Sequence, residues 1–500
     1  MEHRLQNLMT DLATTPILPG LLPDPTICRA GGDFYLANSS MEYSPGIPIW
    51  HSDDLLEWKQ IGNAAGTHFP SGEARPSAGQ YAPTLRFHDG TFFLVGTNLT
   101  ERASAGHWIM RTEDPRSDWT APVFLQGVEG IDPDISWTED GSCLLTYCSW
   151  DKSQAGIKQV EIDPVEGVLL EEPRWVWHGS GLSHPEGPHI YRRGTWWYLV
   201  IAEGGTERGH VVSVARATSP RGPFVGAPHN PIFSHRSTRH PVQNIGHADL
   251  VELADGSWAA VYLGVRPRGR TPRFHVNGRE TYLAAIDWSE GWPVFRDYTA
   301  NQLPPVAATL ERWARPLHPR WVSPGVSPSE CSSTSERGIT LRPAQAPNGA
   351  PSGLFTRIPS QLWEARFRVD PQEAEAHMIL RIDERHFYSL IAQSGIVRAI
   401  SRVGDVEAVV AERPIPTSGS VDLIIRSEES TDGPDLVTLH VRTSEEFLLA
   451  SLDGRYLSTE VAGGFTGRTI GIAAEGGEVV VEEFRFNPFT AEHTAPESDA

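Results

Sequence analysis

The sequence predicts an all-β protein, a five-bladed β-propeller followed by a β-sandwich. Three observations predict this fold class. A turn followed by an aromatic or aliphatic strand recurs five times in the first three hundred residues, no stretch has the pattern of a long amphipathic helix, and short alternating strands continue beyond residue 336. Repeated antiparallel units of about 50 residues are typical of propeller blades. The length of 500 residues also exceeds one ordinary domain.

Each of the five repeats begins with a turn that contains a glycine, and the five glycines stand 51 to 62 residues apart. Glycine supplies the positive φ that tight hairpin turns require. The five segments are GGDFYLANSS, HDGTFFLVGTN, EDGSCLLTYCSW, RRGTWWYLVIAEGG and ADGSWAAVYLGV, and the glycines are Gly32, Gly90, Gly141, Gly194 and Gly256. A second alternating strand follows in the repeats, as in GIPIWHS and HVVSVARAT. This order predicts blades made of antiparallel strands.

One position shortly before each marker glycine carries the functional argument. The residues found there are Asp24, Tyr81, Asp132, Glu186 and His247. Equivalent repeat positions occupy equivalent places around a rotational axis, and the strand before each hairpin is the innermost strand of its blade. We therefore expect the three acids to converge at one mouth of the central channel. A single acid next to proline is more often a turn or a cap, but three inward acids in phase would be costly to bury without a function.

Converging carboxyl groups favour one reaction class. Two carboxyls that flank a glycosidic bond are sufficient for its hydrolysis, because one protonates the leaving oxygen while the other activates water or attacks the carbon. A third acid near the proton donor raises its pKa by like-charge repulsion and keeps it protonated near neutral pH. The pattern therefore indicates a glycoside hydrolase.

The segments around the three acids, PDPTI, IDPDISW and HPEGPHIY, resemble motifs of glycoside hydrolase family 43. The resemblance is to its β-xylosidase and α-L-arabinofuranosidase members with a C-terminal β-sandwich. It implies that Asp24 is the general base, Asp132 the pKa modulator and Glu186 the general acid. It also implies inversion, with base and acid about 6.5–9.5 Å apart, and removal of single pentose units from plant cell-wall oligosaccharides.

The expected sugar is β-1,4-linked xylose, and α-L-arabinofuranose is the alternative on the same catalytic residues. Two departures from many β-xylosidases concern the sugar pocket: Tyr81 stands where they have tryptophan, and Met41 stands where they have phenylalanine. A non-catalytic sugar-binding propeller and a retaining glycosidase are further alternatives. A retaining enzyme would hold its two working carboxyls about 5–5.5 Å apart.

Further segments resemble family regions near the sugar: GGTERGHVVSVARA, which contains Thr206, HPVQNIGHADL and NGRETYL. The resemblance implies that Arg279 contacts a ring hydroxyl, that His247 lies under the site and that Trp150 lines the sugar pocket. A tryptophan that packs inside a blade is the alternative for Trp150.

The second domain is expected after a linker rich in proline and serine. The predicted limits are 1–315 for the propeller, 316–336 for the linker, 337–490 for the sandwich and 491–500 for a disordered tail. The segment AGGFTGRTIGI resembles a family loop that reaches toward the active-site mouth. Phe465 in this loop closes one side of the pocket in that interpretation, which would explain exo action; an ordinary core phenylalanine is the alternative.

No metal ligand set and no required cofactor are predicted. His235, His240 and His247 lie close in sequence, but their spacing matches no zinc signature. The family resemblance allows a structural calcium ion on the propeller axis, outside the chemistry. The four cysteines show no metal or redox spacing and are expected to be reduced thiols.

The formal net charge of −21 argues against nucleic acid and anionic membranes as partners. No window holds the ~18 consecutive apolar residues of a membrane span, and the first twenty residues lack the pattern of a secretory signal. We therefore expect a cytoplasmic enzyme that acts on imported xylo- or arabino-oligosaccharides, either alone or as a homo-oligomer.

Overall fold

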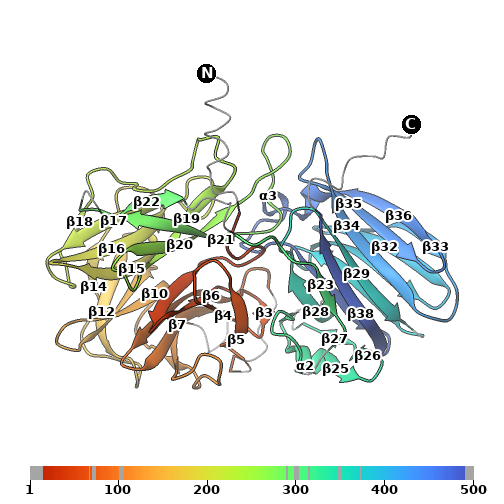
Figure 1. The fold of residues 1–500 in the computed structure, drawn as a ribbon, viewed down its shortest axis with the longest axis horizontal. Coiled ribbons are helices and arrows are strands. Elements are labelled where there is room, and N and C mark those ends of the chain that lie inside the picture. Colours follow the sequence, from red (N-terminus) through yellow and green to blue (C-terminus); the bar gives the residue numbers. More distant parts are fainter. Residues whose placement is uncertain are drawn as a thin grey trace.

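The structure is a computed structural model in which two all-β units lie side by side (Figure 1). It describes residues 15–66, 68–69, 75–100, 106–151, 153–288, 291–297, 303–313, 316–346, 351–371 and 373–489. The first unit is a five-bladed propeller and the second a β-sandwich, which confirms the predicted fold class. No helix in the described part of the chain is long and apolar enough to cross a membrane.

The first three blades are separate antiparallel sheets. Blade one contains β1 (Thr26–Ala30), β2 (Asp33–Ala37), β4 (Pro48–Ser52) and β5 (Lys59–Asn63). Blade two contains β6 (Gly79–His88), β7 (Thr91–Leu99), β8 (Gly106–Thr112) and β9 (Val123–Phe124). Blade three contains β10 (Gly130–Trp137), β11 (Cys143–Ser149) and β12 (Ile157–Asp163), with β13 (Val168–Leu169) and β14 (Arg174–Trp177) paired to β12.

Blades four and five repeat this order. Blade four contains β15 (Glu186–Arg193), β16 (Trp196–Glu203), β17 (Val211–Ala217) and β18 (Val225–Gly226). Blade five contains β19 (Gln243–Glu252), β20 (Trp258–Val265), β21 (Glu280–Asp287) and β22 (Val294–Asp297). The five innermost strands each contact the next, and β1 contacts both β6 and β19, so the ring is closed. Leu18 adds to this closure, because its backbone pairs with Thr281 of blade five.

The hairpin turns and the blade cores follow from the repeat pattern. Gly90 and Gly141 have φ of +80° and +87°, the left-handed region that a side chain would oppose. Apolar residues of neighbouring blades pack together between the sheets, as Val200 of blade four does with Tyr262 of blade five. The hydrophobic cores of the propeller therefore lie between blades and leave the axis to polar residues.

The innermost strands share an irregularity at the predicted channel position. The antiparallel register shifts between Tyr81 and Thr84, between Ile131 and Asp134, between Glu186 and His189, and between Gly246 and Asp249. Asp24, Asp132 and His247 have positive φ of 50°, 55° and 48° at these places. A β-bulge re-aims the side chain that it carries. The bulges in four blades, together with the positive φ of Asp24 before β1, therefore turn one residue of each blade toward the same mouth of the channel.

The sandwich consists of two antiparallel sheets. The first contains β25 (Ser332–Ser335), β26 (Gly338–Leu341), β38 (Val479–Pro488), β29 (Trp363–Asp370), β34 (Val421–Glu428), β35 (Leu436–Arg442) and β36 (Glu446–Asp453), with β23 (Thr309–Glu311) paired to β38. The second contains β27 (Ala344–Gln345), β28 (Pro351–Arg357), β37 (Thr469–Glu475), β30 (Glu375–Arg381), β31 (His386–Gln393), β32 (Ile396–Val403) and β33 (Val406–Pro414). Their inner faces enclose one apolar core that includes Trp321, Trp363 and Phe367.

The strand pairing places the domain boundary differently from the sequence-based limits. β23 lies within the predicted propeller range but belongs to a sandwich sheet, and β25 does the same from within the predicted linker. β24 (Ser323–Pro324) pairs with β3 (Tyr43–Ser44) of the propeller side, and the short helix α2 (Pro328–Cys331) follows. The predicted linker is thus structured, because its backbone joins two sheets. The predicted tail 491–500 lies outside the described residues.

The sandwich also sends one connection back to the propeller. It comprises the short helices η2 (Gly454–Leu457) and α3 (Thr459–Ala462) and the residues before β37. The backbone of Thr459 donates to His275, and that of Arg468 donates to Val276 at 2.8 Å. Figure 1 shows α3 between the two units. We call residues 459–466 the sandwich loop.

Candidate active site

The three predicted acids stand at or near the start of three innermost strands, and Asp132 and Glu186 lie at β-bulges. Asp24 precedes β1, Asp132 lies in β10, and Glu186 is the first residue of β15. Asp24 and Asp132 are buried, and the Glu186 side chain is 20% exposed. The charges of Asp24 and Asp132 both raise the pKa of Glu186. The propeller therefore brings the three carboxyl groups together, as the repeat phase predicts.

Asp24 is surrounded by donors. Ser39 Oγ donates to its Oδ2 at 2.6 Å, and Arg279 Nη1 donates to its Oδ1 at 2.8 Å. Burial raises the pKa of Asp24, but the charges of Arg279 and His247 together with the Ser39 hydrogen bond outweigh burial and leave it below the ordinary value. Asp24 is therefore a carboxylate at neutral pH.

Asp132 contacts the backbone that carries Glu186. The amide of Gly187 donates to Asp132 Oδ2 at 3.0 Å. A side chain at position 187 would come within 3.0 Å of His247 Nδ1, and its φ of +56° also favours glycine. Burial and the charge of Asp24 raise the pKa of Asp132, against the opposing effect of His247. Asp132 thus orients the start of β15, and its negative charge raises the pKa of Glu186.

Glu186 has the properties of a proton donor. Burial first, and then the charges of Asp132 and Asp24, raise its pKa to about 8. His210 Nε2 lies 3.7 Å from Glu186 Oε1, and burial lowers the pKa of His210 to about 3. The His210 Nδ1–H donates to the Asn244 carbonyl at 3.1 Å, so the neutral ring turns a lone pair toward Glu186. A protonated Glu186 suits this neighbour better than a carboxylate.

A cavity of about 490 Å³ opens beside Glu186. It is lined from the propeller and from the sandwich loop, and its walls include the predicted residues Glu186, Thr206, Arg279 and Phe465. Arg279 Nη1 also donates to Thr206 Oγ1 at 3.1 Å, so one guanidinium links the Asp24 carboxylate to the cavity wall. The cavity therefore reaches Glu186 directly and neighbours the Asp24 carboxylate through Arg279.

Phe465 closes one side of this pocket. Its backbone amide donates to Ser77 Oγ at 2.7 Å, and its ring lies edge-on to Tyr81 with 6.1 Å between centroids. The Arg279 guanidinium is 5.6 Å from the same ring. With 39% of its surface exposed, Phe465 is a pocket residue rather than a core phenylalanine.

The other predicted sugar contacts are placed less directly. Tyr81 donates its hydroxyl to the Ser77 carbonyl, and Met41 is buried with its backbone paired to Gln80. Trp150 is 49% exposed after β11, so it does not pack inside a blade. Within the described residues, none of these three is among those lining the 490 Å³ cavity.

Several residues of the site were not selected from the sequence. His210 lies in GGTERGHVVSVARA, a segment that the family resemblance points to, but the segment does not indicate which residue faces the acid. Ser39 follows β2 and precedes the expected pocket position Met41 without any motif of its own. His275 and Glu460 form an ion pair at 2.7 Å that fastens the sandwich loop, and no sequence signal joins positions so far apart.

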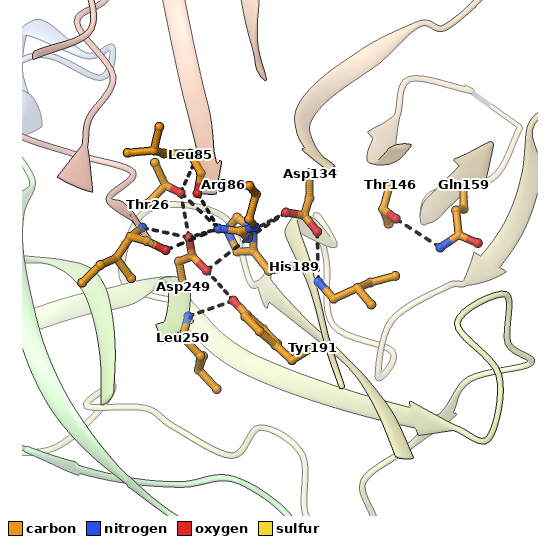
Figure 2. Close-up of polar contacts among 12 residues, drawn as sticks. Thr26, Leu85, Arg86, Asp134, Thr146, Gln159, His189, Tyr191, Asp249 and Leu250 are labelled. Carbon is orange, nitrogen blue, oxygen red and sulfur yellow. Dashed lines mark hydrogen bonds and ion pairs between the residues drawn. The ribbon is translucent and has the colours of Figure 1, made fainter. Parts of the chain in front are cut away.

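Deeper in the channel, an arginine occupies the propeller axis (Figure 2). Arg86 Nη2 donates to Asp134 Oδ1 at 2.7 Å and to His189 Nδ1 at 2.9 Å, while its Nη1 donates to Asp249 Oδ2 at 2.7 Å. Tyr191 donates to the other oxygen of Asp249 at 2.5 Å. Both carboxylates are already paired with this guanidinium, so the axial residues do not fit a calcium ion, which needs six to eight free oxygen ligands.

Comparisons with known proteins agree with this geometry. Residues 13–293 match the family model "Glycosyl hydrolases family 43", and residues 313–489 match "Beta xylosidase C-terminal Concanavalin A-like domain". The chain is 35% identical over 493 residues to the "Non-reducing end alpha-L-arabinofuranosidase BoGH43B" of Bacteroides ovatus, covering 92% of this chain and 91% of that protein.

Two further similarities also extend over nearly the whole chain. A "Xylosidase/arabinosidase" of Butyrivibrio fibrisolvens is 32% identical over 96% of this chain and 99% of its own length. The solved structure "Bacteroides ovatus Xyloglucan PUL GH43B" superposes with a TM-score of 0.86 at 33% identity, covering 95% of this chain and 99% of that chain. The chain is therefore a glycoside hydrolase that belongs to glycosyl hydrolase family 43.

Proposed function

We propose that this protein is an inverting exo-glycosidase that removes one terminal pentose from an oligosaccharide. The observation that carries the proposal is the charge division within the site. The pKa of Asp24 lies below its ordinary value while that of Glu186 is raised to about 8. Near neutral pH the site therefore holds one carboxylate and one protonated acid, the pair that inversion requires.

In this proposal Asp24 is the general base and Glu186 the general acid. Asp24 takes a proton from a water molecule as the water attacks the anomeric carbon, and Glu186 gives its proton to the leaving oxygen as the glycosidic bond breaks. Arg279 holds the Asp24 carboxylate in place and reaches the pocket wall through Thr206. Asp132 supports the acid by its charge and through the Gly187 amide.

The shape of the pocket supports attack on chain ends. The sandwich loop covers one side, with Phe465 held to Ser77 and packed against the Tyr81 ring. A chain that continued on both sides of the cleaved bond would have to pass through this loop. The product of each turnover is therefore a single sugar.

We propose an α-L-arabinofuranosyl unit as the preferred sugar. A relative named as a non-reducing end α-L-arabinofuranosidase is similar over nearly the whole of both chains, and this chain has Tyr81 and Met41 at the two positions that depart from many β-xylosidases. A β-1,4-linked xylosyl unit is the second candidate. It is supported by the two-activity name of the Butyrivibrio fibrisolvens relative and by the name of the C-terminal domain model.

The wider setting is also a proposal. We infer that the enzyme acts in the cytoplasm on short arabino- or xylo-oligosaccharides released from plant cell-wall polymers such as xylan, and that hydrolysis needs no metal. The small size of the pocket supports short oligosaccharides as substrates. Release of pentose from insoluble xylan at the rate seen with soluble oligosaccharides would contradict it.

The proposal is tested with p-nitrophenyl α-L-arabinofuranoside and p-nitrophenyl β-D-xylopyranoside side by side. We expect activity on at least the first, lost in Asp24→Ala and retained in Glu166→Gln, a control that changes an exposed acid in the turn after β12. Proton NMR of the first anomer released checks inversion. Activity that survives Asp24→Ala, or release of the retained anomer, would contradict the mechanism.

A further inference from the structure

Two histidines and an aspartate converge at the outer side of the fifth blade, away from the proposed catalytic acids. His235 and His240 lie in the segment between β18 and β19, and Asp297 is the last residue of β22. Their ligand atoms all lie within 4.8 Å of one another. Asp297 Oδ2 is 3.1 Å from His235 Nε2 and 3.8 Å from His240 Nε2, and the two rings are 3.7 Å apart.

The hydrogen bonds turn acceptor atoms toward one another at this point. His235 Nδ1 contacts the Val242 carbonyl at 3.1 Å, and a carbonyl only accepts, so the proton of the neutral ring is on Nδ1. The Nε2 lone pair then faces a carboxylate oxygen, which is repulsive unless a proton or a metal ion lies between them. His240 Nδ1 lies 3.0 Å from the Val242 carbonyl and 3.1 Å from the Val242 amide nitrogen, so both tautomers of this ring fit its neighbours. Its Nε2 is buried without a hydrogen-bond partner among the described residues, and a metal ion there would select the tautomer whose Nδ1–H donates to the carbonyl.

A proton does not satisfy all three groups as well as a metal ion. One proton on His235 would pair it with Asp297 but would leave His240 Nε2 unpartnered. Protonating both stacked rings, whose centroids are 3.7 Å apart, would place two positive charges side by side. A single cation between the three atoms would be bound by both nitrogens and by the carboxylate.

The surroundings have the features of an outer ligand shell. The Tyr262 hydroxyl donates to Asp297 Oδ1 at 2.9 Å, which leaves Oδ2 free to face the histidines. The Val242 carbonyl accepts a hydrogen bond from His235 Nδ1, the ring nitrogen that does not face Asp297, and so fixes the orientation of the ring. Carboxylate and histidine ligands in metal sites are usually held by such hydrogen bonds. The distances also fit, because ligand atoms at about 2.0–2.1 Å from a tetrahedral zinc ion are about 3.3 Å apart.

We propose that His235 Nε2, His240 Nε2 and Asp297 Oδ2 bind one divalent transition-metal ion of the zinc class. Two imidazoles and one carboxylate favour such an ion over calcium or magnesium, which prefer oxygen ligands. The ion ties the segment before β19 to the end of β22. Asn244, which lines the active-site cavity, follows His240 by four residues. The metal ion thus stabilises the segment that leads into the cavity wall, and it takes no part in the proposed hydrolysis.

The test measures metal binding by chelator-treated protein, with equilibrium dialysis against Zn²⁺ and with visible absorption during titration with Co²⁺. We expect the unmodified protein to bind one equivalent that His240→Gln and Asp297→Asn lose, with affinity lowered more than about 100-fold, since outer-shell changes alone cost 10–100-fold. His229→Gln, which changes an exposed histidine of the same segment, should keep that equivalent.

Two further measurements keep the test independent of how well the ligand variants fold. Tyr262→Phe keeps all three ligands and should weaken binding by about 10–100-fold. Zinc should raise the thermal midpoint of the unmodified protein and of His229→Gln, since a ligand that binds only the folded state stabilises it. No Co²⁺ spectrum in the unmodified protein, or the same stoichiometry in His240→Gln as in His229→Gln, would overturn the proposal and leave an imidazolium–carboxylate pair.

Discussion

Two groups of buried acids lie close together along the innermost strands, and they differ in their electrostatic surroundings. On β10, for example, Asp132 and Asp134 are two residues apart. At the mouth are Asp24, Asp132 and Glu186; on the axis are Asp134 and Asp249. Arg86 lies between the axial acids, and its charge outweighs burial so that the pKa of Asp249 is lowered. The mouth acids have one guanidinium, Arg279, which contacts Asp24, and the pKa of Glu186 rises to about 8.

This comparison shows that the positions of Arg86 and Arg279 determine which buried carboxylates form a structural ion-pair network and which are available for the proposed hydrolysis. Where one guanidinium contacts every acid of the group, as Arg86 does, burial yields a fixed ion-pair network that holds the five blades together. Where the guanidinium contacts only one of the acids, as Arg279 does, another acid keeps its proton near neutral pH. The same β-strands thus provide the scaffold and the proposed acid, with the bulge between Ile131 and Asp134 separating the two environments on β10.

The largest expected effect comes from removing a proposed catalytic group at the mouth. Asp24→Asn and Glu186→Gln should each lower kcat/KM by about 10²–10⁴-fold, the usual contribution of a general acid or base. Steady-state kinetics on an arabino-oligosaccharide measures this, and circular dichroism checks folding. For Glu186→Gln the loss should be smaller on the p-nitrophenyl substrate, whose leaving group needs less protonation. Equal losses on both substrates would contradict the role of Glu186.

The axial group should affect stability rather than chemistry. Arg86→Met leaves Asp134 and Asp249 buried without their cation, and breaking a buried pair in this way costs about 3–5 kcal/mol. Urea denaturation should show this loss in the free energy of unfolding. Arg312→Met, at an arginine whose side chain is 75% exposed, should change it by less than about 1 kcal/mol. Similar values for the two variants would mean that the axial network does not hold the blades.

The pH dependence of kcat/KM tests the excess negative charge at the mouth. Because the proposed role of Glu186 requires its protonated form, and its pKa is raised to about 8, activity should be lost as the pH rises through about 8. Asp132→Asn removes one neighbouring negative charge, which makes ionisation of Glu186 easier, so the alkaline limb should move to lower pH. An unchanged or higher limb in Asp132→Asn would contradict the electrostatic account.

The smallest expected effect concerns the sandwich loop. Phe465→Ala opens the pocket to water, and since burial is the largest cause of the raised pKa of Glu186, the alkaline limb should move down slightly. Loss of the ring contacts with Tyr81 and Arg279 should also raise KM by about 2–13-fold, as expected for aromatic contacts worth 0.5–1.5 kcal/mol. Kinetics over a pH range measures both. A lowered KM would mean that Phe465 obstructs the sugar.

Much of the fold and of the mouth could be predicted from the sequence because both repeat. The five turn glycines mark the blades, and the residues shortly before them, including Asp132 and Glu186, occupy equivalent positions in their own blades. This prediction uses only the spacing of the repeats. The family resemblance then added Arg279 and Phe465, whose positions no repeat indicates.

The remaining features depend on pairings between positions far apart in the chain. Arg86 lies five residues after Tyr81, the predicted channel position of its blade, and nothing local shows that it reaches acids of two other blades. Asp297 joins His235 and His240 across the fifth blade, so spacing among the histidines alone indicated no metal set. The strands around the predicted linker also depend on distant pairings, since β23 and β25 find their partner strands in the sandwich.

The most direct test of the charge division is a titration of Glu186 itself. Protein labelled with carbon-13 at the glutamate side-chain carboxyls would be followed by NMR from pH 4 to pH 10, and comparison with Glu186→Gln would assign its signal. The account predicts a midpoint near 8 for Glu186. A midpoint near the ordinary glutamate value of about 4.3 would contradict the central claim, because the mouth would then hold no proton donor at neutral pH.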